Sequence, residues 1–239
     1  MTGTSDMQEI GEDKGKGILY IVSTPIGNLE DMSLRALRIL KEVDMIAAED
    51  TRQTKKLLTH YEIKKHPVSY HDHNKIRQGE MIAGKLKEGF DVALVSDAGT
   101  PGISDPSYYL INLALKEEIR VEPVPGPTAA ITALSVSGLP TDRFVFEGFL
   151  PRKKGKRRKR LEELSQEERT IILYESPYRV YNVLEEILSI MGNRKVVIGR
   201  EMTKRYEEII RGELEHLLEQ IKGREMKGEI TVILKGLKE

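Results

Sequence analysis

Short apolar runs alternate with helical stretches along most of this chain of 239 residues. The runs ILYIVS (18–23), DVALVS (91–96) and TIILYES (170–176) are rich in branched aliphatic residues, which predicts β-strands. The segments between such runs have the spacing of amphipathic helices. Strands that alternate with helices in this way predict an α/β fold in which many neighbouring strands are parallel.

Two of the predicted helices have a clear apolar face. The first follows Ser33, a candidate N-cap, and its stripe consists of Leu34, Leu37 and Leu40, with Ile39 and Val43 beside it. The second lies within 211–223 and places on one face Leu214, Leu217, Leu218 and Ile221. Both patterns predict helices that cover a sheet.

The chain is long enough for two small domains. We expect a disordered tail over 1–17, an N-terminal α/β domain over 18–123 and a C-terminal α/β domain over 124–239. A cleft between two domains is the expected place for a ligand.

Composition limits the class of protein. Hydrophobic residues make up 39% and charged residues 32% of the chain, which is typical of a globular protein. No apolar run is long enough to cross a bilayer, and the polar start has no signal-peptide core. Because the chain contains no cysteine, disulfides, thiolate nucleophiles and cysteine zinc sites are excluded, and we expect a cytoplasmic protein.

Positive charge is concentrated in one segment. The chain has no net charge, yet RKKGKRRKR (152–160) holds eight basic residues around Gly155. A solvated charged face is one interpretation of such a run. Because no acidic residue is interspersed, the run favours contact with a polyanion.

Four loops at the ends of predicted strands contain more glycine, proline and carboxylate residues than simple turns require. They are STPIGN (23–28), AAEDTR (47–52), SDAGTPGISDP (96–106) and PVPGPTAA (123–130). Glycine lets a backbone approach a ligand closely, and ligands of α/β sheets bind where strands end. Neither a P-loop nor a GxGxxG fingerprint is present. The loops therefore predict a small molecule held largely by backbone groups.

Several motifs together resemble one known family. STPIGNLEDMSLRAL, AAEDTRQTKKLL, SDAGTPGISDP, VPGPTAAITALSVSGLP, FEGFLPRKKGKR, YESPYR and GREMTK occur in the order found in the ribosomal RNA small subunit methyltransferase I family, from about 18 to 236. The resemblance implies a two-domain, tetrapyrrole methylase-like (class III) fold with S-adenosylmethionine in the interdomain cleft. It also implies a homodimer and methylation of a cytidine ribose 2′-oxygen in 16S rRNA, at the decoding centre of the small ribosomal subunit.

The resemblance also implies a set of residues at the methyl donor. These are Pro25, Gly27, Asp97, Gly99, Thr100, Thr128 and Ala129 from the first domain, with Tyr174 and Ile230 from the second. A carboxylate that merely caps a turn is the alternative interpretation of Asp97, and of Asp105 in the same loop.

A hydroxyl group of ribose is a weak nucleophile, so a base is expected to assist its attack. We hypothesise that the target nucleotide faces Asp50, Arg52, Glu175, Arg200 and Glu201. Further base candidates are Asp97, His71 and His73. The two histidines could also form a metal pair, but no further ligand is evident, methyl transfer needs no metal, and a surface or RNA-contacting role is favoured.

The basic run fits an RNA substrate. Its predicted phosphate contacts are Arg152, Lys153, Lys154, Lys156, Arg157 and Arg158, and Gly155 suggests a flexible loop that becomes ordered on binding. Candidates for base stacking are Phe149, Tyr174 and Tyr178. Two rival functions remain open: a methylase of the same fold that acts on a small tetrapyrrole, and a non-catalytic protein that binds the ribosome.

Overall fold

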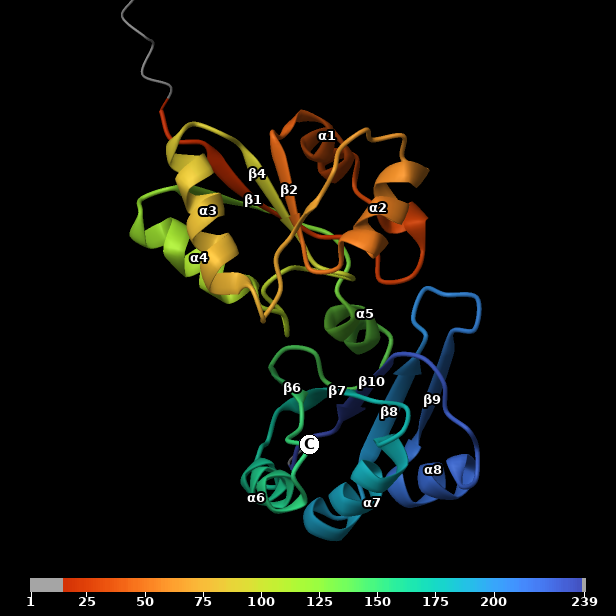
Figure 1. Cartoon of the computed structure of the whole chain (residues 1–239). Helices are drawn as coiled ribbons and strands as arrows, with labels where there is room; N and C mark the ends of the chain where they lie inside the picture. Colours follow the sequence, from red (N-terminus) through yellow and green to blue (C-terminus); the bar gives the residue numbers. More distant parts are fainter. Residues whose placement is uncertain (1–14, 238–239) are drawn as a thin grey trace, which may run out of the picture.

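The computed structural model describes residues 15–237, and these residues form two five-stranded sheets with helices packed on them (Figure 1). The expected tail falls mostly on 1–14, outside the described residues. Gly17 differs from that expectation, because its N–H donates to the Leu86 carbonyl at 2.7 Å.

The first sheet is entirely parallel, as the alternation of strands and helices predicts. Its strand order is β3-β2-β4-β1-β5. The strands are β1 (Ile18–Val22), β2 (Met45–Ala48), β3 (Val68–Ser69), β4 (Val92–Val95) and β5 (Arg120–Val124). The connecting segments contain η1 (Leu29–Asp31), α1 (Leu34–Glu42), α2 (Thr51–His60), α3 (Lys75–Lys87) and α4 (Ser107–Lys116).

Helix α1 begins where its sequence predicts and buries most of the predicted apolar stripe. The Ser33 side chain accepts a hydrogen bond from the Ala36 N–H, which confirms the N-cap. The buried residues are Ala36, Ile39 and Leu40, whereas Leu34 is 85% exposed. The predicted stripe is therefore confirmed at Leu40, Ile39 and Val43, with Leu37 packed against the same cluster, and is wrong only at Leu34, the first residue of the helix, which lies in solvent.

The second sheet has the order β6-β7-β10-β8-β9 and is mixed. Only β6 and β7 are parallel, while the other three pairs are antiparallel. The strands are β6 (Phe144–Phe149), β7 (Thr170–Glu175), β8 (Lys195–Arg200), β9 (Glu208–Glu213) and β10 (Ile230–Leu234). The expectation of parallel neighbours therefore fails here, because β8 and β9 form a hairpin that reverses the chain and was not predicted from the sequence.

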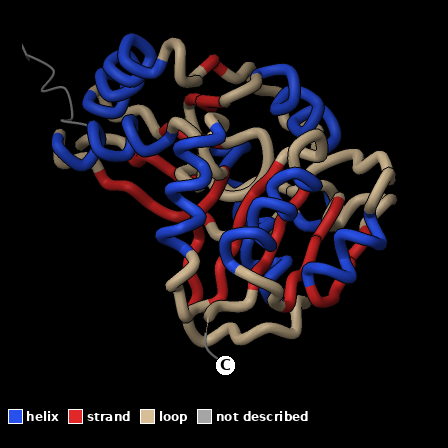
Figure 2. The backbone as a smooth tube through the Cα atoms, turned by 90° about the horizontal axis from the view of Figure 1, so that it is seen from below, coloured by secondary structure: helices blue, strands red, loops and turns tan. Residues whose placement is uncertain are grey.

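Helices cover one face of this sheet (Figure 2). They are α6 (Lys154–Leu164), α7 (Val180–Met191) and α8 (Leu214–Ile221). Helix α8 buries all four residues of its predicted apolar face, which confirms that pattern. Within 15–237, no helix is long and apolar enough to cross a membrane.

Helix α5 (Ala129–Ser135) lies between the two halves (Figure 1). It packs on the face of the second sheet opposite α6–α8, together with Ile26 from the first half. The expected domain boundary near 123 falls at the end of β5, just before this helix. The two sheets are therefore joined by a shared apolar cluster beside the loops that follow β1 and β4.

Candidate functional site

A cavity of about 360 Å³ opens at the carboxyl edge of the first sheet, where the two halves meet. Its walls come from the loop after β4, the start of α5, the end of β7 and the start of β10. Six residues predicted at the methyl donor line it: Gly99, Thr100, Thr128, Ala129, Tyr174 and Ile230. The structure thus brings together positions that are up to 131 residues apart in the sequence.

Hydrogen bonds between loops build the first-domain wall. Thr24 and Gly99 exchange two backbone hydrogen bonds of 2.9 and 3.0 Å. Gly99 has a φ of +82°, a conformation that glycine adopts without steric cost. The Thr100 hydroxyl lies 2.9 Å from that of Ser23 and donates to the Pro127 carbonyl at 3.3 Å. The loops after β1, β4 and β5 therefore form one connected surface.

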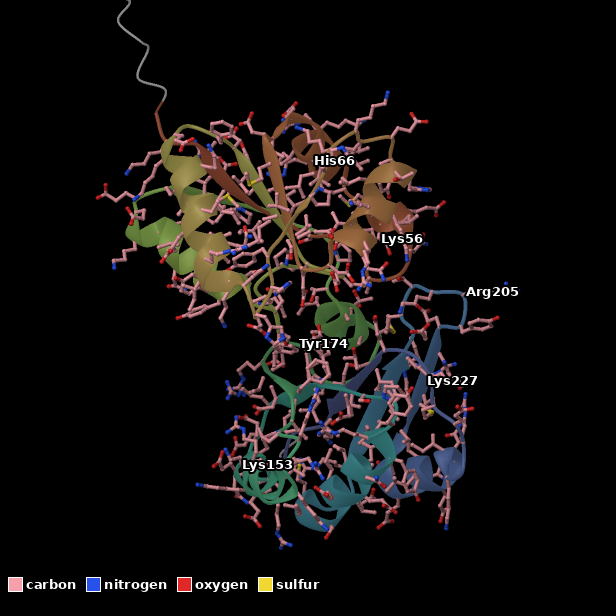
Figure 3. All side chains as sticks on the ribbon, in the orientation of Figure 1. Lys56, His66, Lys153, Tyr174, Arg205 and Lys227 are labelled. Carbon is pink, nitrogen blue, oxygen red and sulfur yellow. The ribbon has the colours of Figure 1, made fainter. Side chains whose placement is uncertain are left out.

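Tyr174 forms the aromatic wall from the second domain (Figure 3). Its hydroxyl accepts a hydrogen bond from the Ala130 N–H at 3.2 Å, and burial raises the pKa of the phenol. The ring contacts Phe146 edge-on, with centroids 5.0 Å apart, and a tilted Phe149 at 5.7 Å. Tyr174 therefore links the first turn of α5 to the second sheet.

The remaining three predicted donor residues line a different hollow. Pro25, Gly27 and Asp97 face a neighbouring cavity of about 270 Å³ that also includes Gln53 and Lys56 of α2. The Asp97 carboxylate accepts a hydrogen bond from the Asp50 N–H at 2.8 Å. This contact joins the loop after β4 to the residue that precedes α2 and is not a cap within the turn of Asp97 itself.

Asp50 and Arg52 are paired with each other at the start of α2. The Asp50 carboxylate accepts hydrogen bonds from the side chain and backbone N–H of Arg52, and these bonds lower the pKa of Asp50 to about 2. Asp50 is also the N-cap of the helix. Its carboxylate is ionised at neutral pH but already occupied by hydrogen bonds.

Glu175 differs from the other candidate carboxylates because it is buried at the edge of the larger cavity. It ends β7, and one of its oxygens accepts the Ser176 N–H at 2.7 Å. The other oxygen lies 3.1 Å from the Arg179 guanidinium in an ion pair. Burial raises the pKa of Glu175 despite this pair.

Arg200 and Glu201 lie behind the cavity rather than in its lining. Arg200 pairs with Glu208 at 3.0 Å. Glu201 pairs with Lys204 at 2.9 Å and accepts the Glu229 N–H at 3.0 Å. Burial alone would raise the pKa of Glu201, but the hydrogen bonds from Lys204 and Glu229 outweigh it, so that pKa is lowered. Both residues support the segment before β10, which does line the cavity.

Several residues in the cavity or close to it were not predicted from the sequence. Glu49 is half-buried, and its pKa is raised by burial and then by the nearby carboxylates of Asp97 and Asp105. Glu49 is the first residue of the EDTR motif, so that motif could have identified it as a candidate. The unanticipated cavity residues Ser176 and Pro177 belong to the YESPYR motif, and so could have been found from it.

The basic run is helical, contrary to the flexible loop expected around Gly155. Gly155 lies in the first turn of α6, because the flanking lysines and arginines are strong helix formers that tolerate one glycine. Arg157 is 9% exposed, and its guanidinium makes hydrogen bonds of 2.8 and 2.6 Å to Glu186. This placement does not fit the predicted phosphate contact of Arg157. Most of the other basic residues are exposed, among them Lys153 (Figure 3).

The two histidines of the HDH motif lie side by side, with ring centroids 5.9 Å apart. Asn74 is a polar neighbour of His71, because its side-chain oxygen accepts a hydrogen bond from the backbone N–H of His71 at 2.8 Å. The described residues contain no group of three or more histidine or carboxylate side chains placed to hold a metal ion.

Comparison with known proteins identifies the family. The family described as Tetrapyrrole (Corrin/Porphyrin) Methylases matches residues 18–218. The chain is 55% identical to "Ribosomal RNA small subunit methyltransferase I" of Halalkalibacterium halodurans, over 92% of this chain and 76% of that protein. It is 50% identical to the protein of the same name from Thermotoga maritima, over 92% of this chain and 99% of that protein.

The chain belongs to the ribosomal RNA small subunit methyltransferase I family, within the tetrapyrrole methylases. Members of this family are methyltransferases, so the reaction needs a methyl donor. The fold agrees with that of a solved structure, cobalt precorrin-4 methyltransferase, which is a cobalamin biosynthetic enzyme. The two structures match with a TM-score of 0.68 and 18% sequence identity, over 91% of this chain and 94% of that chain. The resemblance in the motifs and the expected fold class are therefore confirmed.

Proposed function

We propose that this methyltransferase transfers the methyl group of S-adenosylmethionine to the ribose 2′-oxygen of a cytidine in 16S rRNA, at the decoding centre of the small ribosomal subunit. The observation that carries the proposal is the cavity of about 360 Å³ between the two domains, lined by six of the nine residues expected at the donor. The names of the relatives support rRNA as the substrate class.

The lining suits the proposed donor. Gly99, Thr128 and Ala129 present small side chains and backbone groups, which can approach a polar ligand closely. Ile230 and the ring of Tyr174 supply apolar contact for a flat base. S-adenosylmethionine, when bound, supplies a methyl group already activated by a sulfonium. The protein then has to position the ribose and accept its hydroxyl proton.

Glu175 is our candidate for the general base. It is the only one of the five predicted catalytic residues in the described cavity lining. Its raised pKa makes it a better proton acceptor than an ordinary carboxylate, and one oxygen has only the Arg179 ion pair as partner. We assign Asp50 and Arg52 to orienting the RNA, because the ion pair between them already occupies the Asp50 carboxylate.

Binding of RNA is assigned to the exposed residues near the start of α6. Arg152, Lys153, Lys154 and Lys156 are exposed, and none has an ion pair within 15–237. Such cations contact phosphates without reading sequence, so the choice of nucleotide has to come from the cavity and its rim.

The test is a labelling experiment. The full chain is incubated with S-adenosylmethionine carrying a labelled methyl group and with small ribosomal subunits that lack decoding-centre modifications, and any label is mapped to its nucleotide and atom. We expect label on a cytidine 2′-oxygen. Label on a base atom, or on an added porphyrinogen instead of the subunit, would contradict the proposal.

A further inference from the structure

Tyr178 is a large aromatic side chain that the fold leaves in solvent. It is 90% exposed, and no described residue makes a hydrogen bond to its hydroxyl. It follows directly on Ser176 and Pro177, which line the cavity. An exposed ring beside a ligand site favours a role in binding, because a ring stabilises a fold mainly through the area that it buries.

The backbone that presents this ring is held firmly. The Tyr178 N–H donates to the Ser176 hydroxyl at 3.3 Å, and the Arg179 and Val180 N–H groups both donate to the Ser176 carbonyl at 3.0 Å. The Arg179 guanidinium pairs with Glu175 and donates to the Leu150 carbonyl at 3.3 Å. The ring is therefore presented on a preorganised turn, which lowers the entropic cost of binding.

The surroundings of the ring indicate its partner. Through the contact between Arg179 and Leu150, the turn lies beside Phe149, whose side chain lines the cavity and is 59% exposed. The unpaired cations of Arg152 and Lys153 follow Phe149 within four residues. Rings next to unpaired cations match a single-stranded nucleic acid, in which bases stack on aromatic faces and phosphates contact the cations.

We propose that Tyr178 is a positioning residue that stacks on an unpaired base of the RNA at the mouth of the cavity, and so places the target ribose against the donor site. The inference rests on the proposed function and deepens it. Stacking on a ring is tolerant of the ring's substituents but requires its flat face. The ring of Tyr178 should therefore matter, while its hydroxyl should not.

The test compares Tyr178→Leu, which keeps apolar bulk without a flat face, with Tyr178→Phe, which keeps the ring. Methyl transfer is measured under single-turnover conditions at saturating S-adenosylmethionine, as a function of small-subunit concentration. We expect the half-saturating subunit concentration to rise roughly tenfold for Tyr178→Leu and by less than about twofold for Tyr178→Phe, the order expected for one base stack. Affinity for S-adenosylmethionine, titrated separately, should not change.

Phe90→Leu serves as the control, because Phe90 is a partly exposed ring (39%) that precedes β4 and so lies at the opposite edge of the first sheet from the cavity. Wild-type behaviour of Tyr178→Leu would overturn the inference. So would a loss of S-adenosylmethionine affinity, which would assign the ring to the donor, or equal defects in Tyr178→Leu and Tyr178→Phe. If the wild-type chain places no label on rRNA at all, the proposed function fails instead.

Discussion

Asp50 and Glu175, one candidate catalytic carboxylate from each domain, are held in opposite ways. On the first-domain side, Asp50 and Asp97 are tied to nearby N–H groups, and the pKa of Asp50 falls to about 2. On the second-domain side, Glu175 is buried with one oxygen paired only to Arg179, and burial raises its pKa. Carboxylates in the loops accept hydrogen bonds from backbone N–H groups and so hold the loops in place. The buried carboxylate of Glu175, at the end of β7, keeps the capacity to accept a proton.

Replacing Glu175 should have the largest effect. Glu175→Gln keeps the shape but removes the proton acceptor, so the single-turnover rate of methyl transfer should fall by about 10²–10⁴-fold with little change in S-adenosylmethionine affinity. In the wild-type protein the rate should fall as the pH is lowered through the raised pKa of Glu175, above the usual range of a glutamate. A variant of near-normal rate, or one that keeps this inflection in its pH profile, would exclude Glu175 as the base.

The basic run allows a similar comparison between a buried and an exposed cation. Arg157 pairs with Glu186, and their side chains are 11% and 21% exposed. Arg157→Ala leaves Glu186 largely buried and unpaired, so the free energy of unfolding should fall by about 2–4 kcal/mol in urea denaturation. Lys153→Ala should change it by less than about 0.5 kcal/mol. Equal stability of the two variants would contradict a structural role for Arg157.

The exposed cations should act on RNA binding instead. Combined replacement of Arg152, Lys153, Lys154 and Lys156 by alanine should weaken small-subunit binding and reduce the slope of log affinity against log salt by about 2–3. The control replaces four lysines near the ends of α1, α3 and α4, at the amino edge of the first sheet: Lys41, Lys85, Lys87 and Lys116. An equal loss in both variants would mean that only net charge matters.

Asp50 should show the smallest effect. Asparagine is as good an N-cap as aspartate, so Asp50→Asn should preserve α2 and lose only the ion pair with Arg52. We expect turnover within about fivefold of wild type, measured at saturating concentrations of both substrates. A loss as large as that of Glu175→Gln would move the base to the first domain and reverse the comparison.

These differences also show how far the sequence can predict the molecule. The buried face of α8 could be read directly, because Leu214, Leu217, Leu218 and Ile221 have helical spacing. Strand β9 was missed because Glu208–Glu213 contains charges and a glycine, as edge strands commonly do. Motifs predicted several of the loops that line the cavity, but whether a carboxylate is buried depends on the packing of both domains. Glu175 and Asp50 therefore looked equivalent in the sequence.

The central claim is that the donor binds in the cavity shared by both domains, and titration of S-adenosylmethionine tests it most directly. Ala129→Leu adds bulk to the lining of that cavity, whereas Gln53→Trp adds bulk to the neighbouring cavity beside α2. We predict that Ala129→Leu weakens S-adenosylmethionine binding by more than about tenfold, and that Gln53→Trp binds as wild type does, a contrast set by which cavity the added volume occupies. Normal binding by Ala129→Leu together with impaired binding by Gln53→Trp would place the donor in the neighbouring cavity and contradict the account.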